Sequence, residues 1–136
     1  MKNQQKGFTL IELLVVIAII GLLSTLAVVS LNTAREKSRD TRRISDVKQI
    51  QSALEMYYSD IRSYPAGTNV NYGVTATSIA SSGVVYMQKI PTDPGSGSYL
   101  YTQTDSGASY TLQYILEGTV NGISGTATAT PASISN

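Results

Sequence analysis

The chain has 136 residues, which gives room for one small domain and a long helical element. It contains no cysteine and no histidine, so disulfides and thiolate metal sites are excluded and the commonest general base is missing. The net charge is +1, but 15 of the 19 charged residues fall in residues 1–65. We therefore expect no enzyme, no catalytic residue and no cofactor, and the net charge identifies no partner.

A continuous apolar stretch runs from Phe8 to Leu31, and Glu12 is the only ionisable side chain among its 24 residues. As a helix it would be roughly 36 Å long, enough to cross a hydrocarbon core of about 30 Å. A soluble core helix would have a polar face, which this stretch lacks. A cleaved secretory signal is the closer alternative because Lys2 and Lys6 precede the stretch, but Glu12 and the lack of a good small-x-small site argue against it. We therefore predict a transmembrane helix.

Glu12 has two explanations, which do not exclude each other. Thr9 and Glu12 fit a capping box, in which the Glu12 carboxylate accepts a hydrogen bond from the Thr9 amide at the positive end of the helix. Alternatively, Glu12 meets an opposite charge on another chain, because an acid inside a membrane segment is by default a functional residue. The spacing alone leaves both explanations open.

The stretch KGFTLIELLVVIAIIGLL, residues 6–23, resembles the amino-terminal signature of type IV prepilins and type II secretion pseudopilins. In that family a short basic leader ends in glycine, phenylalanine follows, and glutamate is the fifth residue of an apolar helix. Gly7, Phe8 and Glu12 occupy these positions here. The resemblance implies that a prepilin peptidase cuts between Gly7 and Phe8 and N-methylates Phe8. It also implies that Glu12 pairs with the Phe8 amino group of a neighbouring subunit during filament assembly.

The resemblance further implies where the protein acts and what it binds. It would be a single-pass membrane protein with a cytoplasmic amino terminus and an extracytoplasmic head, and later part of a homo-oligomeric helical filament at the cell surface or in the periplasm. Its partners would be the prepilin peptidase, the inner-membrane assembly machinery and, before assembly, membrane lipid. A plain count of positive charge disagrees with this topology, because five basic residues closely follow the apolar stretch: Arg35, Lys37, Arg39, Arg42 and Arg43.

The helix is predicted to continue beyond the membrane to about Ile61, since no proline occurs before Pro65. Its outer half should pack one face against the rest of the chain, because apolar residues recur at intervals of three and four with Gln51 as the polar exception. These residues are Ile44, Val47, Ile50, Leu54, Tyr57, Tyr58 and Ile61.

The charged run AREKSRDTRR, residues 34–43, lies between the apolar and amphipathic halves of this helix. Clustered basic residues are typical of nucleic-acid binding, but here the charges alternate in sign at helical spacing, which favours a solvated helix face. Lipid headgroups, or ion pairs between packed subunits, would use the same residues. We expect no nucleic-acid partner.

The residues after the helix predict a β-rich head. Tyr64-Pro65 ends the helix, and a loop rich in glycine, asparagine, threonine and serine follows, with room for a short helix. Three strands are then predicted from their tyrosine, valine, threonine and isoleucine content: Val84–Lys89, Ser98–Gln103 and Ser109–Leu116. The segment TDSGA is typical of a hairpin loop between the last two strands.

Alternation along the last two strands puts their large side chains on one face: Tyr99 and Tyr101, then Tyr110, Leu112, Tyr114 and Leu116. We predict that this face packs on the outer half of the helix as a small antiparallel sheet, which makes an α+β fold. The residues from Ile123 on would form an edge strand or a flexible tail, and we favour the flexible tail.

The segment Ile90–Gln103 resembles the P-x-D-P…Y-x-Y segment of major pseudopilins, many of which continue into an aspartate-bearing loop that binds calcium. Here the corresponding segment reads ILEGTVNGISG and lacks paired carboxylates. Asp93 and Asp105 alone fall short of the roughly six to eight oxygens that calcium takes. Backbone carbonyls could add oxygen ligands, so we assign no metal residue here and the sequence does not decide whether the head binds calcium.

These predictions divide the chain into a leader (1–7), a transmembrane and assembly half of the helix (8–31), an amphipathic half (32–62) and a β-rich head (63–136). The predicted function is a structural subunit of a type IV pilus or a type II secretion pseudopilus. The alternative is a membrane-anchored extracytoplasmic binding module that does not polymerise. The sequence does not choose among secretion, adhesion, motility and DNA uptake.

Overall fold

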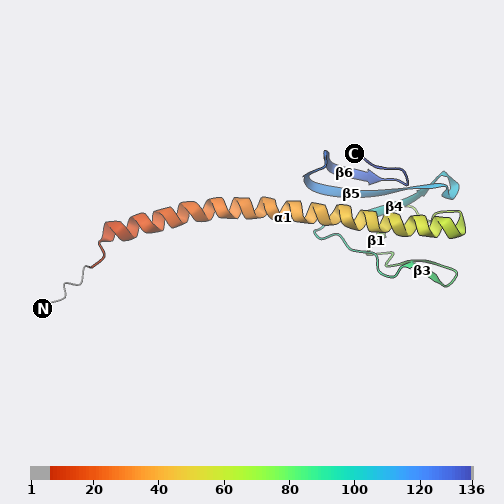
Figure 1. The fold of residues 1–136 in the computed structure, drawn as a ribbon, viewed down its shortest axis with the longest axis horizontal. Helices are drawn as coiled ribbons and strands as arrows, with labels where there is room; N and C mark the ends of the chain where they lie inside the picture. Colours follow the sequence, from red (N-terminus) through yellow and green to blue (C-terminus); the bar gives the residue numbers. More distant parts are fainter. Residues whose placement is uncertain (1–6, 136) are drawn as a thin grey trace. The chain divides into compact units, whose positions relative to one another are not determined.

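The computed structural model describes residues 7–135, so residues 1–6 of the predicted leader lie outside the described residues. The chain divides into two compact units, Met1–Arg35 and Glu36–Asn136. The elements in chain order are α1 (Leu10–Ile61), β1 (Val70–Tyr72), β2 (Ile79–Ser81), β3 (Val84–Met87), β4 (Tyr99–Thr104), the 3-10 turn η1 (Asp105–Gly107), β5 (Ser109–Val120), β6 (Ile123–Ala129) and β7 (Ile134–Ser135) (Figure 1).

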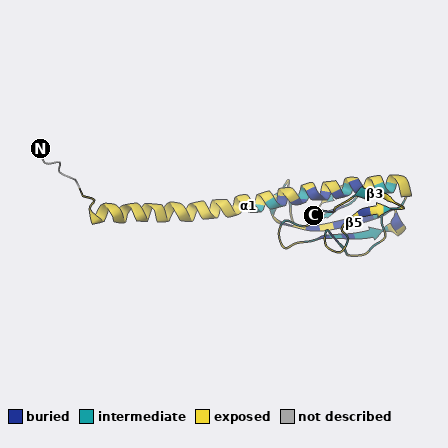
Figure 2. Ribbon diagram, turned by 90° about the horizontal axis from the view of Figure 1, so that it is seen from below, coloured by how far each residue is buried: buried dark blue, intermediate teal, exposed yellow. Residues whose placement is uncertain are grey.

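The first unit consists of the apolar half of α1. Every described residue of this half is exposed to solvent (Figure 2), including Leu26 with 63% of its surface accessible. By length and composition α1 is a helix that could cross a membrane, and no residue of its most apolar window is buried by the chain itself. An apolar surface of this extent marks a site of contact with lipid or with other proteins.

The second unit is a sheet packed on the outer half of α1. Five strands form an antiparallel sheet in the order β1-β4-β5-β6-β7, and β2 and β3 form a separate hairpin. Asn121 and Gly122 connect β5 to β6 with φ angles of 52° and 82°, as a two-residue turn with positive φ at both positions requires. The β5–β6 register shifts between Ile115 and Thr119, which marks a bulge in β5.

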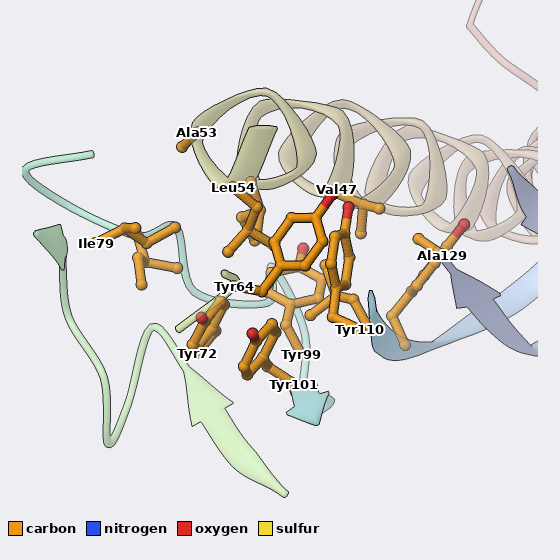
Figure 3. Close-up of a cluster of buried hydrophobic side chains, with 14 of the residues drawn as sticks. Val47, Ala53, Leu54, Tyr64, Tyr72, Ile79, Tyr99, Tyr101, Tyr110 and Ala129 are labelled. Atoms are coloured by element: carbon orange, nitrogen blue, oxygen red, sulfur yellow. The ribbon is translucent and has the colours of Figure 1, made fainter. Parts of the chain in front are cut away.

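The core of this unit is rich in tyrosine. Val47, Ile50, Ala53 and Leu54 of α1 are at most 1% exposed, and Figure 3 shows α1 side chains facing tyrosines of the sheet. The rings of Tyr72 and Tyr101 stack with centroids 4.7 Å apart, a geometry that adds to the hydrophobic burial. The tyrosine-rich face predicted from alternation is confirmed, because all of its members are buried: Tyr99, Tyr101, Tyr110, Leu112, Tyr114 and Leu116.

The end of α1 is held by the β4–β5 hairpin. Tyr64 donates its backbone amide to the Gly107 carbonyl at 2.8 Å, and the side-chain amide of Gln103 donates to the Tyr64 carbonyl at 2.7 Å. The Tyr101 hydroxyl donates to the Pro65 carbonyl at 2.7 Å. The Tyr64-Pro65 pair therefore both stops the helix and anchors the chain where it turns toward the sheet.

The α+β fold, the helix end at Ile61 and the antiparallel sheet agree with the sequence-based expectations. Three details differ. The loop after Pro65 contains the short strands β1 and β2 instead of a helix. The tail for which flexibility was favoured forms β6 and β7, because alternate small residues such as Ala127 and Ala129 are buried against the core. Ile61 is 40% exposed, so the buried stripe of α1 ends before it.

Candidate functional site

The residues predicted for processing lie at the start of α1. Gly7 and Phe8 precede the first helical residue, Leu10, and both are exposed, with Phe8 at 82%. A Cβ atom at Gly7 would meet no heavy atom within 4 Å. Packing among the described residues therefore does not require glycine at position 7. A preference for glycine there would have to come from contact with a partner.

Glu12 closes a capping box with Thr9, as the sequence predicts. The Thr9 amide and hydroxyl donate to the same carboxylate oxygen, Oε2, at 2.8 and 2.6 Å, and the Glu12 amide donates to Thr9 Oγ1 at 3.3 Å. Within residues 7–135, the other oxygen, Oε1, accepts no hydrogen bond and the carboxylate pairs with no cation. The cap thus uses one oxygen of Glu12 and leaves its charge uncompensated by the described residues.

The surroundings of Glu12 are apolar and open. A shallow surface hollow beside the carboxylate is lined by Phe8, Ile11, Val15 and Val16, all of which are exposed. A group that entered this hollow would approach Glu12 across an apolar surface. Shielding from water strengthens an ionic interaction.

A second cluster of functional groups lies in the head unit and is centred on a buried guanidinium. We call it the Arg43 cluster; its members are Arg39, Asp40, Arg43, Asp93 and Glu117. The Arg43 side chain is 3% exposed. Its Nε and Nη2 donate to the two carboxylate oxygens of Asp93 at 2.7 and 2.9 Å, and its Nη1 donates to Asp40 Oδ1 and Glu117 Oε1, each at 2.7 Å.

The expectation that residues 34–43 form a solvated face is therefore wrong for Asp40 and Arg43. Both are buried, because the packed face of α1 continues toward the amino terminus at the same three-and-four spacing: 40, 43, 47, 50 and 54. The three-and-four spacing alone indicates one packed face of the helix. Its first two positions are charged, however, so the apolar periodicity does not include them.

Asp40 ties α1 to the bulge of β5. Its carboxylate accepts the Glu117 amide at 3.0 Å and the Gly118 amide at 2.8 Å. These residues lie within the interval where the β5–β6 register shifts, and a bulge takes residues out of the regular strand ladder. The helix thus supplies the acceptor that these two amides need.

Asp93 holds a glycine-rich loop against the same guanidinium. The Gly95 and Gly97 amides donate to Asp93 Oδ1 at 2.7 and 3.2 Å. A Cβ atom at Gly95 would lie 2.7 Å from Arg43 Nη2, too close for an ordinary contact. The backbone of this loop can approach Arg43 so closely only because residue 95 has no side chain.

The charges of the cluster shift one another's ionisation. Hydrogen bonds from Arg39 and then from Arg43 lower the pKa of Glu117 to about 2. Burial raises the pKa of Asp93, but hydrogen bonds from Arg43 and Gly95 outweigh it, and the net effect is a lowered pKa. The neighbouring Asp46 differs: burial raises its pKa against the hydrogen bond that Tyr99 donates to it at 3.0 Å.

The Arg43 cluster is a structural contact that holds separate segments of the head together. Its carboxylates are directed at guanidinium groups and backbone amides, and across residues 7–135 no group of three or more histidine, cysteine, aspartate or glutamate side chains is arranged to hold a metal ion. It joins α1, β5 and the loop before β4 at one point. The group around Glu12, by contrast, has an open surface and a charge that no described residue compensates.

Comparison with known proteins gives consistent matches along most of the chain. The prokaryotic N-terminal methylation motif matches residues 2–28, and the family described as type II secretion system (T2SS), protein G matches residues 30–130. The type II secretion system core protein G of Escherichia coli K12 is 31% identical over 121 residues, covering 81% of this chain and 80% of that protein. The proteins of the same name from Aeromonas hydrophila and Pseudomonas aeruginosa are 35% and 33% identical, covering 72% and 74% of this chain and 73% and 75% of their own lengths. No solved structure matches the chain significantly.

Replacing Arg43 with methionine should destabilise the head by about 3–5 kcal/mol, because it leaves buried carboxylates without their counter-charge. Arg42→Met is the matched control: its side chain is 65% exposed and its nearest acid, Asp46, is 3.9 Å away, so we expect a loss of no more than about 1 kcal/mol. Urea unfolding of the full-length protein in detergent, followed by tyrosine fluorescence, measures both. An equal loss of unfolding free energy in both variants would contradict this prediction, because the buried arginine would then stabilise the head no more than the exposed one.

Acid should weaken the head through Glu117 and Asp93. Their folded-state pKa values are lowered, so the stability that they contribute is complete above an ordinary carboxyl pKa of about 4 and is lost as the pH falls toward about 2. Asp46, whose pKa is raised, has the opposite effect: its contribution to stability grows as the pH falls, so the stability of the head depends less steeply on pH. Urea midpoints measured across this pH range should fall less steeply for Glu117→Gln than for the unchanged protein. Identical slopes would contradict this assignment.

Proposed function

The chain belongs to the type II secretion system protein G family of pilin-like filament subunits, and from this premise we propose that it is a secretion pseudopilus subunit processed between Gly7 and Phe8. A prepilin peptidase removes residues 1–7 and N-methylates Phe8, and the mature chain assembles through α1. The observation that carries the proposal is Glu12, whose charge has no partner among the described residues, at the start of an exposed apolar helix.

The position of the cut is supported by local structure. Gly7 and Phe8 lie outside the helix and are exposed, so a peptidase can reach the bond without unwinding α1. Because packing among the described residues does not require glycine at position 7, we attribute the Gly-Phe pair to recognition by the peptidase. The same division makes residues 8–31 the membrane and assembly half, 32–62 the amphipathic half and 63–136 the head.

The role of Glu12 follows from what the cut creates. A new amino group at Phe8 is positively charged near neutral pH, and methylation of an amine retains that charge. We propose that this group enters the apolar hollow beside Glu12 of a neighbouring subunit, where Oε1 is available. A pair of charges that meet in only one alignment also sets the register between subunits, as buried polar residues do in coiled coils.

The cellular arrangement is part of the same proposal. The amino terminus is cytoplasmic and the head extracytoplasmic, and the subunit rests in the inner membrane until the assembly machinery extracts it into a homo-oligomeric helical filament in the periplasm. The names of the similar proteins refer to type II secretion, which favours a secretion role over adhesion, motility or DNA uptake.

The intact mass of the protein from membranes of cells with a prepilin peptidase tests the processing step. We expect a chain that begins at Phe8 and carries one additional methyl group, and a Gly7→Asp variant should retain its leader. Gly21→Ala is a suitable control, because a Cβ atom there also meets nothing within 4 Å. A full-length chain beginning at Met1 would instead favour a membrane-anchored binding module that does not polymerise.

Two substitutions separate the pairing role of Glu12 from its capping role. Glu12→Gln removes the charge but can still cap the helix, and we expect filaments to be lost while the protein stays in the membrane. Thr9→Val removes the hydroxyl that donates to Glu12 but keeps the carboxylate, and filaments should persist. Electron microscopy and shearing assays count the filaments. The reverse pattern, with filaments lost only in Thr9→Val, would make the cap the essential function.

A further inference from the structure

The outer half of α1 has one side that the head does not cover, and it belongs entirely to the second compact unit. At about 100° per residue, the exposed residues between Lys37 and Asp60 all fall within an arc of about 140°, opposite the residues that pack on the sheet (Figure 2). We call this arc the exposed face of α1. Its centre is occupied by uncharged side chains, among them Ser45, Ser52 and Met56.

Four charged residues line the two edges of the exposed face. Arg42 and Asp60 lie at one edge, at the same angle around the helix. Lys48 and Glu55 lie at the other edge, about 120–140° around the helix from the first two. All four are exposed. Each edge therefore carries one cation nearer the apolar stretch and one acid nearer the end of the helix.

These charges have little compensation within the chain. Arg42 has only a long ion pair, at 3.9 Å, with the buried Asp46, and within residues 7–135 Lys48 has none. Over the same residues Glu55 and Asp60 accept hydrogen bonds from tyrosine hydroxyls, at 2.8 and 3.0 Å, and pair with no cation. The exposed face therefore offers two cations and two acids to an external partner.

Two parallel copies of this helix can pair both cations with both acids at once. When the exposed faces of two parallel helices meet, opposite edges come together. Arg42 of one copy then faces Glu55 of the other, which is 13 residues farther along the sequence. Lys48 faces Asp60, which is 12 residues farther along. Both pairs therefore form at one axial offset of about 18–20 Å between the copies.

We propose that the exposed faces of α1 in neighbouring subunits pack in parallel at this offset, so that the two cations of one subunit pair with the two acids of the next. The proposal rests on the proposed function, because it concerns contacts within the same filament. Charges at the edges of a helix–helix contact set the partner and the register, as they do in coiled coils. The two subunits use different residues, so the contact does not close on itself, as a filament requires.

Other arrangements and partners fit these charges less well. Without the offset, the cations of the two copies would lie beside each other, and like charges repel. At the proposed offset, the other cation of the exposed face, Lys37, comes level with the uncharged Gln49. An antiparallel pair would also join cations to acids, but subunits held in one membrane in one orientation cannot form it. A nucleic acid or an anionic lipid surface would be repelled by the two acids.

Thiol cross-linking in filaments sheared from cells with a prepilin peptidase and the assembly machinery tests the offset. The chain contains no cysteine, so the variant S45C/M56C supplies the only thiols. At the proposed offset, position 45 of one subunit lies within about 2 Å of the level of position 56 of the next. Within one chain the two positions are about 16 Å apart, too far for a disulfide. Oxidation should therefore give a ladder of linked multimers in denaturing electrophoresis.

The single variant S52C is the matched control for the ladder. Its copies in contacting subunits lie about 18–20 Å apart at the proposed offset and should stay unlinked. In an antiparallel pair, or in a parallel pair without the offset, they would come level and form a dimer. An antiparallel pair would also link S45C/M56C only into dimers.

Charge exchange tests the pairs themselves. K48E should reduce the yield of sheared filaments about fivefold or more, because it replaces an attraction with a repulsion, and K48E/D60K should restore the yield. K89E reverses another exposed lysine and should leave the yield unchanged.

Three results would overturn the offset contact and leave filament assembly intact: filaments of S45C/M56C without a ladder, dimers of S52C, or a yield of K48E/D60K no higher than that of K48E. If the unchanged chain forms no filaments, the proposed function fails and the contact fails with it.

Discussion

The head is organised around one requirement, which is that a buried guanidinium must find acceptors for its donors. Arg43 meets it by drawing a carboxylate from each of three segments: Asp40 from its own helix, Asp93 from the loop before β4 and Glu117 from β5. Each acid then has further tasks, since Asp40 accepts the amides of the β5 bulge and Asp93 accepts those of its loop. The irregular parts of the sheet are therefore built around the same charge.

The two halves of the helix α1 are suited to different surroundings, although they form one continuous element of secondary structure. Its outer half is stabilised within the chain, by the tyrosine core and the Arg43 cluster. Its apolar half has no described contact that would stabilise it and depends on lipid or on neighbouring subunits. Such a helix can exchange a lipid environment for a protein one during assembly, because both are apolar and the backbone hydrogen bonds stay within the helix. Glu12 is the one ionisable group in the Phe8–Leu31 stretch for which the two environments differ in kind.

Local patterns in the sequence were sufficient for the parts of the fold that depend on local physics. Pro65 located the end of α1, alternation located the buried face of β5, and the Thr9–Glu12 spacing predicted the cap that the structure contains. The burial of Arg43 was missed because its partners Asp93 and Glu117 are 50 and 74 residues away. No spacing in the sequence predicts that β5 will bulge, or that the backbone amides of the bulge will need a hydrogen-bond acceptor. A strand from Ile123 on was the less favoured of two alternatives because the buried residues of β6 are alanines, which carry little hydrophobic signal.

The separation of Arg43 from its partners has a kinetic consequence. During synthesis, the apolar stretch and the charged run emerge long before Glu117, the last of the residues that neutralise Arg43. The nascent chain therefore exposes the complete set of charges first, and only later buries some of them in the head. Because the closing contacts join distant residues, formation of the head is governed by slow, non-local pairing. The apolar half of α1 is therefore synthesised before the head can fold.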